Sequence, residues 1–181
     1  MLVALVGQPN SGKSALLGCL TGAKVFTSNY PGTTVEVTEG RAPGTGITVL
    51  DTPGIYSMRA LSKEQQVTRN VISGRRPQVI VNVIDGTNLR RQLPLTLSLK
   101  SLGIPMVLAV NQADRLKELG IDIDLQVLER ETGAEAVLTS AIRGEGIQSL
   151  ILAVRRAATS GAGQDAFLAS FSPHDLRSLH R

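Results

Sequence analysis

The segment Gly-Gln-Pro-Asn-Ser-Gly-Lys-Ser at residues 7–14 could bind a chain of phosphates. Its glycines let backbone N–H groups turn inward around phosphate oxygens, and a helix that begins there adds the positive end of its dipole. Lys13 can reach the β and γ phosphates, and Ser14 offers a hydroxyl to Mg²⁺. The segment lies between an expected strand and an expected helix, so a chance glycine-rich turn is the weaker interpretation. We expect ligand contacts from Gly7, Asn10, Ser11, Gly12, Lys13, Ser14 and Ala15.

A second loop, Asp-Thr-Pro-Gly at residues 51–54, follows another expected strand. Open α/β sheets bind their ligands at the carboxyl ends of strands. Asp51 can hold Mg²⁺ through water, and the backbone N–H of Gly54 can contact a γ phosphate, so hydrolysis would release the loop that follows. A plain Pro-Gly turn would explain the four residues alone, but their position after the phosphate loop favours a switch.

The stretch 23–34 is expected to be a long loop that closes over Mg²⁺ and the γ phosphate. It contains Thr33 and Thr34, and one of these hydroxyls is expected to coordinate the metal. Residues 29–32 are turn formers, so an ordinary surface loop is the alternative interpretation.

The segment Asn-Gln-Ala-Asp at residues 111–114 follows a further apolar run and could select a base. The Asp114 carboxylate can accept hydrogen bonds from the N1–H and the exocyclic amine of guanine, whereas adenine offers no matching donor pair. Asn111 is expected to hold the surrounding loops together, and the Thr-Ser-Ala segment with Ser140 and Ala141 would bring a backbone N–H to the guanine oxygen. An Asx turn and a helix cap are the alternatives. The pattern predicts binding of GTP and GDP rather than ATP.

Short apolar runs alternate with segments of helical period, which predicts an α/β fold with helices on both faces of a mostly parallel, six-stranded sheet. The run 35–42 alternates in polarity, and the turn residues 43–46 join it to the next run as a hairpin, which indicates one antiparallel edge strand. Asp124 is a suitable N-cap, and Gly103 and Gly133 are suitable helix stops. The other expected strands are 2–6, 46–50, 79–84, 106–110 and 136–138, and the expected helices are 13–20, 63–73, 91–102, 125–132 and 147–158.

The chain has 181 residues, of which 42% are hydrophobic and 19% charged, as in an ordinary globular domain. Its single cysteine, Cys19, excludes an intramolecular disulfide and a cysteine-rich zinc site. No apolar run reaches the roughly 18 to 20 residues of a membrane span, and the apolar start is too short for a signal peptide. The net charge of +4 permits a polyanionic partner, but with only 3% aromatic residues no nucleic-acid partner is expected. Residues 1–158 are expected to form one domain, followed by a flexible linker and tail at 159–181.

The four motifs in this order resemble those of the small GTPase fold with its P-loop, over residues 1–158. The family can be narrowed, because the segments 7–22, 29–36, 51–58, 85–114 and 139–147 resemble the GTPase domain of the FeoB ferrous-iron transporter family. The most family-specific parts are Asn-Tyr-Pro-Gly-Thr-Thr-Val-Glu in the switch and Asp-Gly-Thr-Asn-Leu before a helix.

This resemblance implies a Mg²⁺-dependent GTPase, slow alone, that regulates ferrous iron uptake through a membrane permease domain. It implies Thr34 rather than Thr33 as the switch threonine. Ile55 stands where GTPases of the Ras type carry a water-orienting glutamine, and the resemblance implies instead a potassium ion held by Asn10. The implied catalytic residues are Asn10, Lys13, Thr34 and Gly54, and the implied metal ligands are Ser14, Thr34 and Asp51 for Mg²⁺ and Asn10 for K⁺.

Two residues depart from the family pattern. Gln8 stands where the family often has Asn, and Gln112 replaces the residue that packs on the guanine face, so base affinity is expected to be lower than in relatives. The helical and membrane domains of FeoB proteins cannot fit within residues 164–181, so the chain is either an excised domain or a minimal form. It is expected at the cytoplasmic face of the inner membrane, and oligomers are possible. His174 and His180 are interpreted as tail residues rather than metal ligands.

Two other functions remain open from the sequence. An Era-like ribosome-assembly GTPase shares the Asp-Thr-Pro-Gly loop and the glycine-rich segment after Ala141, but it would need an RNA-binding module. A nucleotide-dependent regulatory module whose hydrolysis has no function is the third possibility. Hydrolysis rates with and without a partner would distinguish it from the first.

Overall fold

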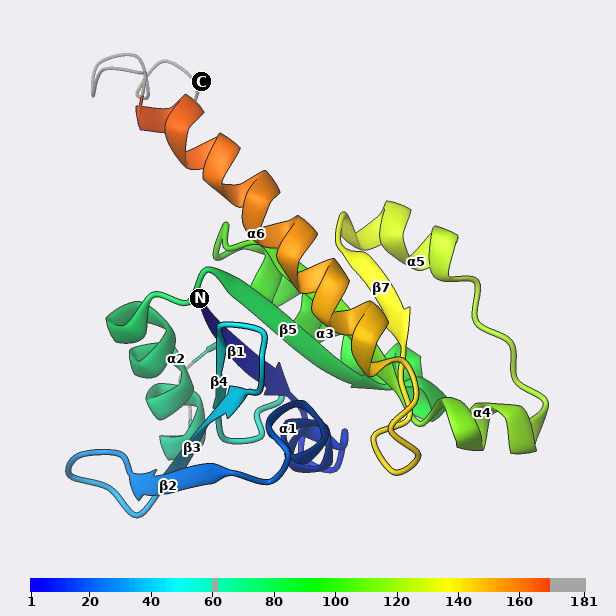
Figure 1. Cartoon of the computed structure of the whole chain (residues 1–181), viewed down its shortest axis with the longest axis horizontal. Coiled ribbons are helices and arrows are strands. Elements are labelled where there is room, and N and C mark those ends of the chain that lie inside the picture. The colour runs from blue at the N-terminus through cyan, green and yellow to red at the C-terminus, as the bar shows by residue number, and fades with distance from the viewer. Residues whose placement is uncertain (60–61, 170–181) are drawn as a thin grey trace.

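The computed structural model describes residues 1–59 and 62–169, and Figure 1 shows a twisted sheet with helices on both faces. The seven described strands follow the order β2-β3-β4-β1-β5-β6-β7. Neighbours from β4 to β7 run parallel, whereas β2, β3 and β4 pair antiparallel. The strands are β1 (Leu2–Gly7), β2 (Val25–Asn29), β3 (Glu36–Ala42), β4 (Ile47–Asp51), β5 (Val79–Asp85), β6 (Met106–Asn111) and β7 (Glu135–Leu138).

The helices form two layers because alternate residues of the central strands point to opposite faces of the sheet. Leu5 and Val81 pack with α1 and α6 on one face, while Val6 and Ile80 pack with α2, α3 and α5 on the other. The central strands are therefore buried on both sides, as their apolar sequences predicted. The helices are α1 (Lys13–Thr21), α2 (Lys63–Arg75), η1 (Gly86–Asn88), α3 (Leu89–Lys100), α4 (Ala113–Leu119), α5 (Leu125–Thr132) and α6 (Ile147–Ala169).

The prediction of six strands was wrong by one, because β2 lies within the stretch 23–34 that was expected to be a loop. All residues of β2 are exposed, Phe26 to 73%, and among the described strands β2 pairs only with β3. A strand with no buried face needs no hydrophobic alternation, so its sequence carries no period-two signal. The Thr27 and Thr38 hydroxyls, 2.9 Å apart, add a cross-strand hydrogen bond.

The predicted hairpin and two predicted helix ends are confirmed. Residues between β3 and β4 form the turn, in which Thr45 N donates to Ala42 O at 3.3 Å. Asp124 caps α5 by accepting from Val127 N at 3.0 Å, and Gly133 ends it in a left-handed conformation. Helix α3 ends at Lys100, before the predicted stop at Gly103.

Helix α6 continues to Ala169, through the Gly- and Ser-containing stretch that was expected to be a flexible linker. The Thr159 and Ser160 hydroxyls donate to the carbonyls of Arg155 and Arg156 one turn earlier, at 3.0 and 3.1 Å, so these polar side chains are accommodated within the helix. The division of the chain at residue 158 stays a prediction, and His174 and His180 lie outside the described residues. None of the helices within 1–59 and 62–169 is long and apolar enough to cross a membrane.

Candidate nucleotide-binding site

The predicted motifs meet at one edge of the sheet. Gly7, Asp51 and Asn111 are the last residues of β1, β4 and β6, and Thr139 directly follows β7. Because these strands are parallel, their carboxyl ends lie at the same edge, and the loops that follow them surround one site.

The phosphate loop has a backbone that only certain residues tolerate. Asn10 and Gly12 have positive φ angles of 65° and 91°. At Gly12 a Cβ would also collide with the side-chain nitrogen of Asn111, so glycine is needed there for two independent reasons. The turn is closed by Ser11 N donating to Gln8 O at 3.2 Å, and Leu16 N donates to Gly12 O at 2.9 Å as α1 begins.

Lys13 and Ser14, at the end of the phosphate loop, both contact Asp51. Lys13 Nζ is 3.5 Å from Asp51 Oδ1, and the Ser14 hydroxyl donates to Asp51 Oδ2 at 3.4 Å. The Lys13 and Asp51 side chains are only 9% and 11% exposed. Burial raises the pKa of Asp51, and the charge of Lys13 opposes this rise.

Two buried side-chain atoms in the described part of the chain lack a hydrogen-bond partner, Ser11 Oγ and Asp51 Oδ1. Both belong to this site. Asp51 Oδ1 has its ion-pair contact with Lys13 but no hydrogen bond, which leaves a buried carboxylate oxygen under-satisfied. The arrangement therefore has unused capacity for a cation at Asp51.

The Asp-Thr-Pro-Gly loop packs directly on the phosphate loop. Ile55 N donates to Gly7 O at 3.0 Å, and a Cβ on Gly54 would lie 3.0 Å from Pro9 Cα. Ile55 itself is 1% exposed and belongs to the hydrophobic core. Its side chain can therefore neither orient nor polarise a water molecule.

Asn111 connects the phosphate loop with the two base-side loops. Its amide nitrogen donates to Ser11 O at 3.1 Å, and its Oδ1 accepts from Ala141 N at 3.1 Å and from the Thr139 hydroxyl at 3.3 Å. The side chain is buried, so these bonds are made in a low-dielectric environment. The expectation that Asn111 holds the loops together agrees with this geometry.

Asp114 lies beside this connection. The Ser140 hydroxyl donates to Asp114 Oδ1 at 2.6 Å, and this hydrogen bond is the main cause that lowers the pKa of Asp114. Asp114 is therefore ionised at neutral pH, and its carboxylate is oriented by Ser140.

A cavity of about 280 Å³ lies between these loops. Gly12 and Ala15 bound it on the side of the phosphate loop, and Asp114 bounds it on the base side. Sequence reasoning missed two further lining residues, Arg115 and Ile142, because neither belongs to a motif with an assigned chemistry. The complete lining is Gly12, Ala15, Asn111, Gln112, Asp114, Arg115, Ala141 and Ile142.

Most backbone N–H groups of residues 139–143 already have an acceptor within the protein. Ala141 N donates to Asn111 Oδ1, and Ser140 N donates to Glu145 O at 3.1 Å. Thr139 N and Arg143 N are also bonded internally, to Val110 O and Ser140 Oγ. Within this segment, Ile142 offers the N–H that makes no hydrogen bond to another described residue.

The structure does not bring Thr34 to the other site residues. It lies in the turn between β2 and β3, and the tip of this hairpin points away from α1 in Figure 1. The Thr33 hydroxyl is used within the turn, donating to Tyr30 O at 3.0 Å and accepting from Val35 N at 3.2 Å. Thr34 is exposed, and its hydroxyl makes no hydrogen bond to the described residues.

Comparison with known proteins agrees with this geometry. The family model described as Ferrous iron transport protein B matches residues 1–154. The Fe(2+) transporter FeoB of Salmonella typhimurium is 37% identical over 162 residues, which are 86% of this chain and 21% of the transporter. The chain thus spans about a fifth of the length of this relative.

Solved structures of FeoB proteins share the fold. A mutant of S. thermophilus NFeoB bound to GDP has a TM-score of 0.84 at 37% identity, with 89% of this chain and 64% of that chain covered. The FeoB G-domain from Methanococcus jannaschii has a TM-score of 0.73 at 36% identity, with 87% of this chain and 97% of that chain covered. The family model, the similar transporters and the solved structures all indicate the same family, and the chain therefore belongs to the ferrous iron transport protein B (FeoB) family.

Proposed function

We propose that this chain is a guanine-nucleotide-binding domain that hydrolyses GTP. The observation that carries the proposal is a single cavity bounded by the phosphate loop at one side and by Asp114 at the other, with Asn111 bonded to both sides. The GDP-bound FeoB relatives support it. They do not favour the Era-like alternative.

Base selection rests on Asp114 and on the segment after β7. The ionised carboxylate accepts from the N1–H and the exocyclic amine of guanine, and an adenine in its place would leave a charged acceptor without donors. The N–H of Ile142 is available for the guanine oxygen, and the N–H of Ala141 can contribute if it is shared with Asn111. Gln112 and Ile142 line the cavity and can contact the faces of the base.

The residues around Asp51 fit a Mg²⁺ ion. Asp51 Oδ1 is a buried oxygen whose one close polar contact is the ion pair with Lys13 at 3.5 Å, and the Ser14 hydroxyl lies beside the same carboxylate. Mg²⁺ is usually held by one or two protein oxygens together with phosphates and waters, so this small donor set is sufficient. Ser14 and Asp51 would hold the ion, with Thr34 joining if the β2–β3 hairpin closes over the nucleotide. When bound, the ion neutralises charge on the phosphates.

The remaining residues position the phosphates. Lys13 can donate to phosphate oxygens, and the N–H groups of the phosphate loop cradle them in the ground state and in the transition state. Gly54, packed on Pro9, can offer its N–H to the γ phosphate. Because Ile55 is apolar and buried, it can neither orient the attacking water nor offset the charge that develops during hydrolysis, and another group must offset that charge.

Asn10 is the residue that we propose to hold a potassium ion for this purpose. It lies on the exposed outer part of the phosphate loop, and its amide makes no hydrogen bond to the described residues. Its side-chain oxygen is therefore available as a ligand. A monovalent cation there would place positive charge beside the phosphates, as an arginine finger does in other GTPases.

The experiment is GTP turnover by the 181-residue chain in potassium and in sodium buffer. We expect potassium to stimulate turnover of the unaltered chain and not of Asn10→Ala. Asn70→Ala, at an exposed position of α2, is the matched control and should retain stimulation. Equal rates in both buffers would refute the role of Asn10, whereas absence of any GTP turnover would refute the enzymatic function.

For the longer protein we propose that the nucleotide state of this domain regulates ferrous iron uptake by a membrane permease domain, with this domain at the cytoplasmic face. The support is membership of the FeoB family and the short span of the chain on its relatives. Iron uptake measured with the phosphate-loop variant Lys13→Ala in the full-length protein tests this proposal. Undiminished uptake would contradict it.

A further inference from the structure

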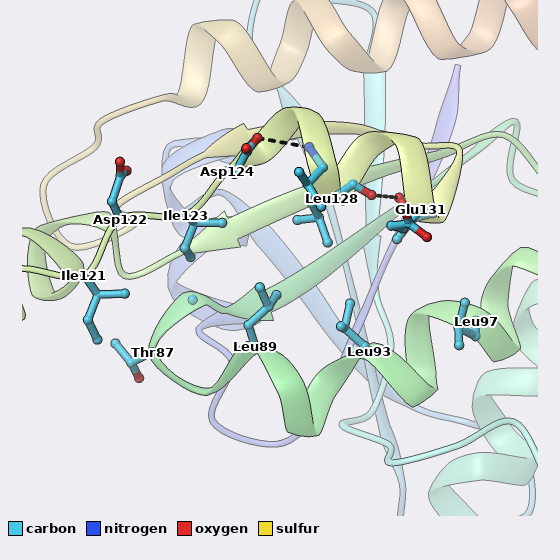
Figure 2. Close-up of a pocket in the computed structure, with 13 residues that line it drawn as sticks. Thr87, Leu89, Leu93, Leu97, Ile121, Asp122, Ile123, Asp124, Leu128 and Glu131 are labelled. Carbon is cyan, nitrogen blue, oxygen red and sulfur yellow. Dashed lines mark hydrogen bonds between the residues drawn. The ribbon is translucent and has the colours of Figure 1, made fainter.

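A hollow between α3 and α5 lies away from the nucleotide cavity. It has a volume of about 690 Å³ and shares no lining residue with the nucleotide cavity. Figure 2 shows Leu89, Leu93 and Leu97 pointing from α3 toward Ile123 and Leu128 on the opposite wall. We call this hollow the α3–α5 groove.

The groove exposes apolar side chains that a folded chain normally buries. Leu97, Ile121 and Val127 line it and are 57%, 44% and 40% exposed, and they come from α3, from the loop before α5 and from α5. On α3, Leu89, Leu93 and Leu97 recur every fourth residue and so form one continuous ridge. A contiguous apolar hollow contributed by separate segments is typical of a surface that a partner covers.

The groove also has a charge opposite to that of the chain. Its 13 lining residues include Asp122, Asp124 and Glu131 and contain no Lys, Arg or His, although the whole chain carries +4. Asp122 has no ion-pair partner among the described residues, and Glu131 has only the exposed neighbour Arg130 at 3.4 Å. Asp124 caps α5, so the carboxylates of Asp122 and Glu131 are the ones available to a cationic occupant.

The backbone around the groove limits the form of that occupant. The lining residues lie in η1, α3, α5 and the loop before α5, and none lies in a strand. An extended peptide would find no sheet edge to pair with, whereas a helix satisfies its own backbone and offers one apolar face.

Because the groove has a leucine ridge on α3, acidic side chains on its opposite wall and no sheet edge, we propose that the α3–α5 groove binds an amphipathic helix of another polypeptide. The apolar face of this helix packs against the leucine ridge of α3. Lysine or arginine side chains beside that face pair with Asp122 and Glu131. The proposal does not depend on GTP hydrolysis, since the groove is separate from the nucleotide cavity.

The probe is a synthetic helical peptide of leucine and lysine, with leucines at spacings of three and four, and a twin in which glutamate replaces every lysine. Binding to the full chain is followed by fluorescence anisotropy. We expect one peptide to bind per chain. The leucine–lysine peptide should bind at least about tenfold more tightly than the leucine–glutamate peptide, because the carboxylates of the groove repel glutamate.

Protein variants locate the binding. Leu97→Gln combined with Val127→Gln should weaken the leucine–lysine peptide by about tenfold or more, because both side chains lie in the groove. Leu152→Gln, at a 54% exposed position of α6, is the matched control and should bind as the unaltered chain does. GDP binding should be unchanged in all variants, which shows that they fold.

Three results would overturn the proposal. They are absence of binding by the leucine–lysine peptide, equal binding of both peptides, and undiminished binding by the groove variant.

Discussion

Replacing Asp114 with asparagine tests base recognition with little change in shape. In the structure Asp114 Oδ1 accepts from Ser140 at 2.6 Å, and an asparagine oxygen can keep this bond. The substitution changes the second carboxylate oxygen, Oδ2. In the unaltered chain this oxygen accepts the hydrogen bonds from guanine, whereas the NH₂ group of asparagine is a donor and would face the donors of guanine. Hydrogen bonds to charged groups contribute about 1.5 to 3 kcal/mol each. These values are net of exchange with water and are not additive for two bonds to one carboxylate, so we expect a loss of about 2 to 3 kcal/mol, or about 30- to 150-fold in Kd for GDP.

The assay is titration calorimetry with GDP, ADP and xanthosine diphosphate. Xanthine carries a carbonyl in place of the exocyclic amine, so Asp114→Asn should bind it better than the unaltered chain does. Asp122→Asn, an exposed aspartate outside the nucleotide cavity, is the control and should bind GDP normally. If Asp114→Asn keeps its preference for GDP over ADP, the assignment of Asp114 to the base is refuted.

Three further outcomes follow from the site. Ser14→Ala should weaken GDP binding in Mg²⁺ but not in EDTA, since it removes a hydroxyl beside Asp51 (3.4 Å), and equal losses in both buffers would contradict this role. Ser140→Ala removes the main cause of the lowered pKa of Asp114, so the loss of GDP binding on acidification should begin at a higher pH. The shift is toward higher pH because the lowered pKa in the unaltered chain keeps the Asp114 carboxylate charged to lower pH. An unshifted curve of GDP binding against pH would show that Ser140 has no such effect. Gly12→Ala should reduce stability by at least about 1 kcal/mol through positive φ and the collision with Asn111, measured by denaturant unfolding, and an unchanged midpoint would count against the geometry.

The position of the phosphate, switch and base motifs at one sheet edge could be predicted from sequence. Each motif follows an apolar run, and runs of parallel strands end at the same edge. Residues 7–14, 51–54 and 111–114 therefore had to meet once the sheet was parallel, and the structure brings them together.

Features that depend on tertiary contacts could not be predicted in this way. Strand β2 has no buried face and so no hydrophobic period. Ile142 and Arg115 line the cavity only because the loops after β7 and β6 meet there. The hydrogen bond from Ala141 N to Asn111 depends on a side-chain position that spacing does not specify. The α3–α5 groove likewise forms from segments that carry no motif.

GTP-specific hydrolysis at this site is tested by the rate of phosphate release by the 181-residue chain with GTP and with ATP, each compared with Lys13→Ala. We expect release from GTP above the Lys13→Ala background and no release from ATP above it. Equal turnover of GTP and ATP would contradict the role of Asp114 in selecting the base. GTP turnover that Lys13→Ala leaves unchanged would contradict the assignment of the phosphate site.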